Sequence, residues 1–289
     1  MNKQRPHHSY DGYSLRRAAD PRDFIDCQQL QKLVWGMNDL DIVPVHLLRV
    51  FVDGGGLVIN AYSDTQRPIG TTISFPMKYA RKPVLYSHMT GVLRNYHNKG
   101  IGLALKLEQR KFALKEGFDL VCWTYDPLRS QNNWFNLNKL GAIARTYYAN
   151  YYGNLAARLY RGLESDRFLA EWWVKSPRVK NTLELKTKTN STHSVVLNET
   201  KVRNGLRRPW RKPNLQARGW SLRVEIPAHI ELSQDEDPSA LKHWRNDTRQ
   251  ICLHYFSRGY IVTEAETDKL TDRTFIRLER GPLQRILRN

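Results

Sequence analysis

The residues with the clearest chemical potential form a glycine-bearing turn at positions 97–102, His-Asn-Lys-Gly-Ile-Gly. The stretch before it, residues 84–92, is β-branched and aromatic and predicts a buried strand. The stretch after it, residues 103–114, mixes Leu and Phe with Lys and Gln and predicts a largely buried helix. A helix N-terminus offers unpaired N–H groups and the positive end of its dipole, and glycine lets phosphate oxygens approach the backbone. The glycine turn therefore predicts a pyrophosphate site.

An ordinary turn is the competing interpretation, because Gly-x-Gly occurs in many turns without a ligand. The better-known nucleotide patterns do not fit the spacing. Leu103 and Ala104 follow the last glycine, where a P-loop needs Lys and Ser or Thr. A dinucleotide fingerprint needs a third glycine, which is absent here. The spacing therefore favours a diphosphate cradle of another kind.

The motif Val92-x-x-x-Tyr96-His97-x-x-Gly100-x-Gly102 resembles the acyl-coenzyme A signature of the GNAT superfamily of N-acyltransferases. Two further segments narrow the resemblance, Gly-Phe-Asp-Leu-Val-Cys-Trp-Thr-Tyr-Asp-Pro-Leu at 117–128 and Asn-Leu-Asn-Lys-Leu-Gly-Ala at 136–142. Together they resemble a subfamily of predicted acetyltransferases with a Trp-Thr-x-Asp-Pro-Leu motif. Some members of that subfamily are linked to N-succinylation of amino acids.

The resemblance implies a binding site for acetyl-CoA or another acyl-CoA as co-substrate, with no metal. Backbone groups of Val92 would bind the pantetheine arm, and Asn132 and Asn136 would add side-chain contacts, although capping and surface roles are equally ordinary for asparagine. The pyrophosphate oxygens would accept hydrogen bonds from the backbone N–H groups of the glycine turn, namely those of His97, Asn98, Lys99, Gly100, Ile101 and Gly102. His97 stands where relatives carry Arg or Gln, and Lys99 offers a replacement charge.

Acyl transfer needs a base for the attacking amine, donors for the oxyanion and an acid for the leaving thiolate. His88 has a near-neutral intrinsic pKa and is the candidate base, or else a hydrogen-bonded core histidine. Leu137 occupies the place of the tyrosine that many relatives use as acid, so Tyr125, another tyrosine such as Tyr147, or solvent would substitute. Asp126 would hold a substrate ammonium or accept its proton, unless it only caps a turn before Pro.

The order of predicted elements indicates an α/β (α+β) fold. Together with the resemblance, it implies a GNAT-like mixed, mainly antiparallel sheet flanked by helices, with a C-terminal β-α-β-β extension. We expect a disordered N-terminus (1–12), an acyltransferase domain (13–175), a basic linker or excursion (176–220) and a small α/β extension packing on the first domain (221–289).

The formal net charge of +18 is concentrated in residues 175–223, which hold thirteen Lys and Arg against Glu184 and Glu199. A nucleic-acid contact is one interpretation of this segment. A solvated, poorly ordered connector is the interpretation that we favour. Coenzyme A itself needs only a few cations, so the charge excess does not decide between functions.

No stretch of eighteen apolar residues is present, and the first eight residues carry no apolar signal core, so a cytoplasmic protein without membrane contact is expected. Cys27, Cys122 and Cys252 lack zinc-ligand spacing and are expected to be buried small hydrophobes.

The leading hypothesis is an acyl-CoA-dependent N-acyltransferase that moves an acetyl or succinyl group to a small-molecule amine, with amino acids among the acceptors. The alternatives are a nucleic-acid-binding protein that uses the basic segment, and a non-catalytic coenzyme A-binding module.

Overall fold

The computed structural model describes residues 7–153, 163–186, 194–203, 205–230 and 237–288. The chain forms two compact units, an N-terminal unit (Met1–Trp123) and a C-terminal unit (Thr124–Asn289). The boundary falls inside strand β6 (Leu120–Tyr125), earlier than the end expected for the first domain at residue 175. The functional division at residues 175 and 220 stays a prediction.

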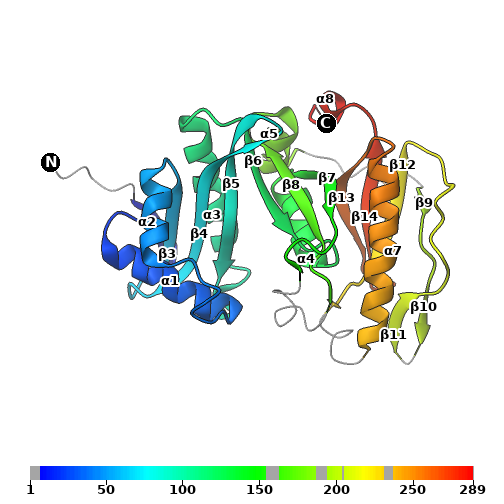
Figure 1. Ribbon diagram of the computed structural model, residues 1–289, viewed down its shortest axis with the longest axis horizontal. Helices are drawn as coiled ribbons and strands as arrows, with labels where there is room; N and C mark the ends of the chain where they lie inside the picture. The colour runs from blue at the N-terminus through cyan, green and yellow to red at the C-terminus, as the bar shows by residue number, and fades with distance from the viewer. Residues whose placement is uncertain (1–6, 154–162, 187–193, 204, 231–236, 289) are drawn as a thin grey trace. The chain divides into compact units, whose positions relative to one another are not determined.

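The sheet of the N-terminal unit runs in the order β1-β2-β3-β4-β5-β6 (Figure 1). Its strands before β6 are β1 (His7–Tyr10), β2 (Tyr13–Arg17), β3 (Leu57–Ser63), β4 (Pro68–Tyr79) and β5 (Lys82–Val92). Neighbouring strands are antiparallel except β5 and β6, which are parallel. The predicted mixed, mainly antiparallel sheet is confirmed.

Strand β1 corrects part of the prediction that residues 1–12 are disordered. It pairs with β2 through four positions, and the ring of Tyr10 stacks on that of Tyr13 with centroids 4.8 Å apart. Backbone pairing and ring stacking give this short segment a fixed place on the sheet. Residues 1–6 lie outside the described residues.

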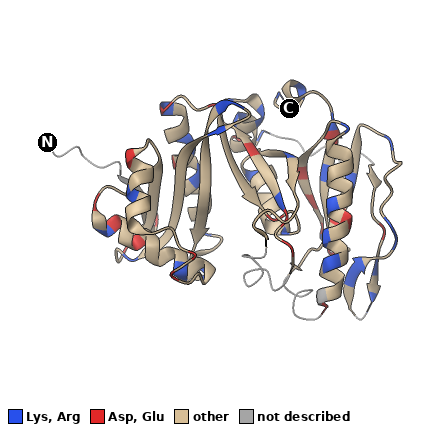
Figure 2. Cartoon of the chain, in the orientation of Figure 1, with Lys and Arg blue, Asp and Glu red and all other residues tan. Residues whose placement is uncertain are grey.

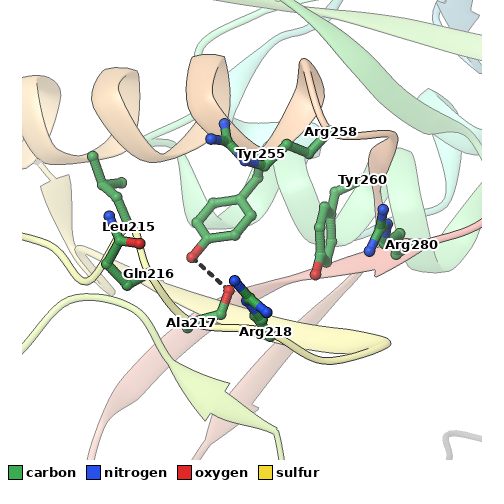
Figure 3. Close-up of a pocket in the computed structure, with 8 residues that line it drawn as sticks. All are labelled: Leu215, Gln216, Ala217, Arg218, Tyr255, Arg258, Tyr260 and Arg280. Carbon is green, nitrogen blue, oxygen red and sulfur yellow. Dashed lines mark hydrogen bonds between the residues drawn. The ribbon is translucent and has the colours of Figure 1, made fainter.

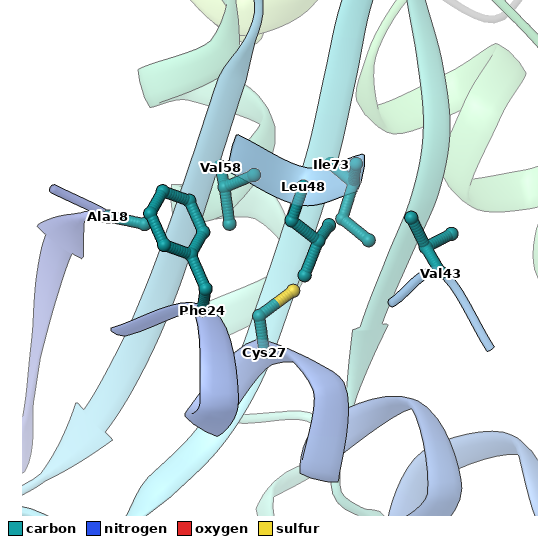
Figure 4. Close-up of a cluster of buried hydrophobic side chains, with 7 residues drawn as sticks. All are labelled: Ala18, Phe24, Cys27, Val43, Leu48, Val58 and Ile73. Carbon is teal, nitrogen blue, oxygen red and sulfur yellow. The ribbon is translucent and has the colours of Figure 1, made fainter. Parts of the chain in front are cut away.

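Three helices cover this sheet: α1 (Pro21–Trp35), α2 (Val45–Asp53) and α3 (Ile101–Lys115). Helix α1 begins at Asp20 with a reciprocal capping box to Asp23, which satisfies N–H groups of its first turn. A buried hydrophobic cluster joins α1 and α2 to β3 and β4 (Figure 4). Its members are Ala18, Phe24, Cys27, Val43, Leu48, Val58 and Ile73.

Helix α3 lies on the opposite face of the sheet from α1 and α2 (Figure 1). Ile73 belongs to the hydrophobic cluster under α1 and α2, while its neighbours Thr72 and Ser74 accept hydrogen bonds from Gln109 of α3. Successive strand residues point to opposite faces, so the two sets of helices must sandwich the strands. The sheet thus separates two different environments along β4 and β5.

The sheet of the C-terminal unit runs in the order β8-β7-β13-β14-β12-β9. Its strands are β7 (Ile143–Tyr148), β8 (Arg167–Trp173), β9 (Val195–Val196), β12 (Ser221–Ile226), β13 (Tyr260–Asp268) and β14 (Arg273–Arg280). Its helical segments are α4 (Ser130–Asn133), the π-helical η2 (Trp134–Lys139), α5 (Pro177–Leu183), α7 (Pro238–Phe256) and α8 (Leu283–Ile286). The succession β12-α7-β13-β14 confirms the predicted β-α-β-β extension.

The basic segment carries more regular structure than a connector would. It includes α5, strand β9 on the sheet edge, and a hairpin of β10 (Thr200–Arg203) and β11 (Leu206–Pro209). Figure 2 marks the positions of Lys and Arg along it and along α7 in blue. Several are neutralised locally: Arg207 lies 3.5 Å from Glu225, and Arg208 lies 2.7 Å from Asp237. Residues 187–193 and 204 of the segment lie outside the described residues.

A buried ion pair joins the start of the C-terminal unit to α7. The guanidinium of Arg245 donates to both carboxylate oxygens of Asp126, at 2.8 and 2.9 Å. Both side chains are nearly inaccessible to solvent. Burial alone would raise the pKa of Asp126, but the charge and hydrogen bonds of Arg245 outweigh it and hold that pKa below its ordinary value. Asp126 is therefore an ionised, fully engaged carboxylate.

We predict that Arg245→Met lowers the apparent free energy of unfolding by about 3 kcal/mol or more, because the buried Asp126 carboxylate loses both hydrogen bonds from Arg245 and keeps a longer ion pair of 4.0 Å with Arg167. Urea denaturation followed by circular dichroism measures the effect. The control is Lys242→Met, which removes an exposed cation from the same helix. Equal midpoints for the two variants would contradict a stabilising role for the pair.

Candidate functional site

The glycine turn forms the start of helix α3, as predicted. Gly100 is the residue before the first helical turn and adopts φ 78°, a left-handed conformation that favours glycine. The first helical N–H that donates back into the turn is that of Ala104, which reaches the Gly100 carbonyl at 3.0 Å. Within the described chain, the N–H groups of residues 98–103 donate to no acceptor. The turn therefore presents a set of open backbone donors at the positive end of a helix.

The space in front of these donors is open. A Cβ added at Gly100 or at Gly102 would meet no atom within 4 Å. Lys99 is exposed, and its ammonium lies 5.1 Å from the centroid of the Tyr96 ring. An anion could thus approach the backbone from solvent with a cation beside it, which is the geometry of a phosphate site at a helix N-terminus.

The side chain of His97 makes a different contact from the one expected of the Arg or Gln in the signature. Its Nε2 lies 2.9 Å from the carbonyl oxygen of Val92, so the imidazole donates to the last residue of β5 and ties the turn to the strand. The imidazole is therefore committed to the backbone, and the N–H of His97 is also engaged, donating to the Arg94 carbonyl at 3.1 Å. His97, predicted to offer its N–H to the pyrophosphate, therefore drops out of the donor set, and the open N–H groups of the turn begin at Asn98. The Val92 carbonyl is correspondingly already an acceptor.

Strands β5 and β6 part from one another near their middle. Their parallel ladder joins Leu85 to Val121 and Tyr86 to Cys122 and, among the described residues, ends there. Beyond this point β5 continues to Val92, still paired with β4. We call the point beyond Tyr86 and Cys122 the fork. A fork between parallel strands exposes backbone groups of both, which an extended ligand can use.

His88 is the extra residue of a β-bulge at the fork. Ile73 of β4 pairs with Met89 and Ser74 pairs with Ser87, so His88 has no partner opposite it. Its ring centroid lies 6.0 Å from that of Phe75, which stacks on Phe51 of α2. The imidazole therefore lies on the α1–α2 face, partly open to solvent, and desolvation lowers its pKa below 6.5. A neutral imidazole is able to accept a proton at pH 7.

A buried amine occupies the other face of the fork. The side chain of Lys106, on α3, is 2% exposed, and its ammonium nitrogen lies 3.0 Å from Ser87 Oγ and 2.9 Å from Gln109 Oε1. The same nitrogen lies 3.6 Å from the centroid of the Trp123 ring. Ser87 and Trp123 are the first residues beyond the β5–β6 ladder. Desolvation lowers the pKa of Lys106 from 10.5 to about 7, against a smaller opposing effect of Cys122.

Sequence reasoning missed Lys106 and its partner Gln109, because it gave neither residue a role within a helix that it predicted to be largely buried. One signal was available. Ile101, Leu105 and Gln109 recur every four residues and so share one helix face, which is the buried one here. A Gln on that stripe, with a Lys three residues before it, indicates a polar cluster facing the strands rather than solvent.

The remaining predicted site residues lie in the C-terminal unit. Tyr125 is buried, its hydroxyl donates to Asn133 Oδ1 at 3.3 Å, and burial raises its pKa. Asp126 is committed to Arg245 and also caps the turn, accepting from the Leu128 N–H at 2.9 Å. The raised pKa of Tyr125 disfavours proton exchange near neutral pH, and the Asp126 carboxylate is already held by the Arg245 guanidinium, so we leave both out of the proposed catalytic set.

The two predicted asparagines differ in exposure. Asn132 is exposed on α4, whereas Asn136 is buried in η2. Their neighbour Asn133 makes the structural contacts, donating to the carbonyls of Pro127 and Arg129. A coenzyme A contact for Asn132 or Asn136 stays a prediction.

The C-terminal unit also has a cavity of about 330 Å³ beside the end of α7 (Figure 3). It is lined by Leu215, Gln216, Ala217, Arg218, Tyr255, Arg258, Tyr260 and Arg280. The hydroxyls of both tyrosines donate to backbone carbonyls of the 214–219 loop. None of the predicted site residues lines it.

Within the described residues, no group of three or more His, Cys, Asp or Glu side chains could hold a metal ion. No helix in the same part of the chain is long and apolar enough to cross a membrane. The three cysteines are buried and free, as predicted.

Comparison with solved structures finds partial likenesses to acetyltransferases. One is the NatC complex bound to Gag peptide and CoA, with 18% identity over 55% of this chain and 97% of the other, and a TM-score of 0.44. A second is a putative GNAT-family acetyltransferase from Desulfovibrio desulfuricans, with 16% identity over 56% and 99% of the two chains and a TM-score of 0.44. A third is a GNAT-family acetyltransferase from Elizabethkingia anophelis with acetyl-CoA bound, with 14% identity over 57% and 99% and a TM-score of 0.41.

No family model matches the sequence, and no curated protein matches it. The functional proposal below therefore stands on the motif in the sequence and on the geometry of the glycine turn and the fork.

Lys106 predicts an unusual pH dependence of stability. Its amine keeps a proton up to about pH 10.5 in the unfolded chain and loses it near pH 7 in the folded one. Between these values the unfolded state binds more protons, so the contribution of Lys106 makes the free energy of unfolding rise with pH, by at most about 1.4 kcal/mol per unit. Lys106→Met should remove this rise in urea denaturation at pH 7–10. Lys111→Met, at an exposed position on the same helix, should retain the rise. If the free energy of unfolding had the same slope against pH in Lys106→Met and in the wild type, that result would contradict the burial of a titrating amine.

Proposed function

We propose that the protein is an acyl-CoA-dependent N-acyltransferase that transfers an acetyl or succinyl group to the amine of a small molecule, with amino acids as one acceptor class. The observation that carries the proposal is the open N-terminus of α3 at Gly100, directly after a strand that parts from its parallel neighbour. A diphosphate bound at the turn and an extended arm that enters the fork would be two parts of one ligand, coenzyme A.

The glycine turn would hold the pyrophosphate through its N–H groups, with Lys99 adding charge. Gly100 and Gly102 support this role because each leaves open space where a side chain would stand. The pantetheine arm would lie along β5 near Val92 and lead the thioester to the fork. The chain thereby supplies position and orientation, which are the largest requirements of a two-substrate transfer.

His88 would act as the base at the fork. It lies on the α1–α2 face, so the amine acceptor would approach the thioester from that side. The bulge at His88 also leaves backbone groups outside the ladder, and an N–H there would stabilise the oxyanion of the tetrahedral intermediate. His88 would take the proton released when the amine nitrogen bonds to the carbonyl carbon.

Gly100→Glu should weaken binding of coenzyme A at least about tenfold in calorimetric titration, because it places a carboxylate against the pyrophosphate. The matched control is Gly117→Glu at the other end of α3. Gly117 has φ 81° against 78° for Gly100, and both lie in open space, so the two variants carry the same backbone strain.

Only the Gly100 variant should lose affinity, while the two should lose stability equally. Unchanged coenzyme A binding by Gly100→Glu would remove the glycine turn from the site. Absence of coenzyme A binding by the wild type would overturn the proposed function altogether.

His88→Gln should slow release of free coenzyme A from acetyl-CoA in the presence of pooled amines by about 10²-fold, with coenzyme A affinity unchanged. The wild-type rate should fall as pH drops through the pKa of His88, below 6.5, because the protonated imidazole no longer accepts a proton. The variant should lack this acidic limb. Tyr86→Phe, a neighbour on the same face, should keep it; an acidic limb that survives in His88→Gln would exclude His88 as the base.

A further inference from the structure

The buried ammonium of Lys106 is the most unusual group of the N-terminal unit, and the function proposed above does not use it. A hydrogen-bonded amine inside a protein costs desolvation free energy, and a Met or Leu of similar volume would avoid that cost. The polar cluster around Lys106 is built for it: Ser87, Gln109 and, through Gln109, Ser74 and Thr72. The cluster lies at one place, where β5 and β6 separate.

We propose that Lys106 is the acid that protonates the leaving thiolate of coenzyme A at the fork. The inference rests on the proposed function, because it requires the thioester to reach the fork. Two contacts support it. Ser87 and Trp123, the first residues beyond the ladder on each strand, both contact the Lys106 amine. An arm that enters between the strands therefore ends at this amine.

Lys106 would supply the acid for the leaving thiolate that the other candidate residues do not supply. Leu137 stands where the resembling acyltransferases carry a tyrosine acid, and burial raises the pKa of Tyr125 further away from neutral pH. Burial lowers the pKa of Lys106 to about 7, so the group exists as both ammonium and amine near neutral pH and exchanges a proton readily. The titratable side chain that faces it from β6 is Cys122, while its partners on α3 and β5, Gln109 and Ser87, are uncharged.

The step balances as follows. The amine nitrogen of the acceptor bonds to the carbonyl carbon and gives its proton to His88. The carbon–sulfur bond then breaks, and the sulfur takes a proton from the Lys106 ammonium to leave as the thiol. Lys106 ends as a neutral amine and His88 as an imidazolium, and exchange with solvent restores both.

The test uses bound coenzyme A and needs no acceptor. Thiolate absorbs in the ultraviolet, so a pH titration of the wild-type complex reports the pKa of the bound thiol. A nearby ammonium favours the thiolate and lowers this pKa, and the thiolate in turn raises the pKa of the amine, so that the two groups titrate as a coupled pair. We expect Lys106→Met to raise the pKa of the bound thiol by at least one unit, a tenfold change in thiolate fraction, while calorimetric affinity for coenzyme A stays within about threefold. Removal of a buried amine should leave the fold intact in thermal denaturation.

Ser74→Ala is the matched control for a purely structural role. It removes one hydrogen bond from the same buried cluster without touching Lys106, and the thiol pKa should not move. In turnover, Lys106→Met should lower kcat for coenzyme A release by about 10²-fold with little change in KM.

Two results would overturn the assignment in distinguishable ways. If coenzyme A binds equally to wild type and Lys106→Met with the same thiol pKa, Lys106 is structural and the proposed acyltransferase stands without it. If wild type binds no coenzyme A, the acid assignment falls together with the proposed function.

Discussion

A buried amine needs a hydrogen-bond partner for each of its protons. For Lys106, this requirement links one helix to three strands. Its nitrogen contacts Ser87 of β5 and Trp123 of β6, and Gln109 extends the cluster to Ser74 of β4. The hydrogen bonds fix the rotation of α3 over the strands. Because the glycine turn is the first turn of α3, the direction of its open N–H groups follows from the same contacts.

Many of the basic residues in the C-terminal unit are paired within it. Several of its carboxylates are buried, and some of these serve more than one partner. Glu225 is buried and contacts both Arg273 and Arg207, and Asp166 accepts from both Arg249 and Tyr147. Buried acids of this kind are stabilised by arginine, whose planar guanidinium forms paired hydrogen bonds. The arginines in these pairs stabilise buried acids and are neutralised by them, so their presence does not by itself indicate an anionic partner.

The sequence was most informative where one local rule decides the structure. Gly100 needs a left-handed conformation at a helix start, so the turn was predictable from six residues, and helical spacing predicted α7 in the extension. It failed where a contact joins distant residues. Arg245 and Asp126 are 119 positions apart in the sequence, and no local sequence pattern predicts that they form a pair. The same holds for β9, whose two residues become a strand only because β12 is beside them.

His88 and Lys106, to which we assign the proton transfers, lie on opposite faces of one strand. Ser87 faces α3 and Lys106, whereas the bulged His88 faces Phe75 and the α1–α2 side. Burial lowers the pKa of Lys106 to about 7, and desolvation lowers the pKa of His88 below its ordinary value. In direct contact they would share a proton and titrate as a pair. With the backbone of β5 between them, the imidazole can stay neutral while the amine stays charged. This combination suits a reaction in which the acceptor amine attacks the thioester on one side and the thiolate leaves on the other.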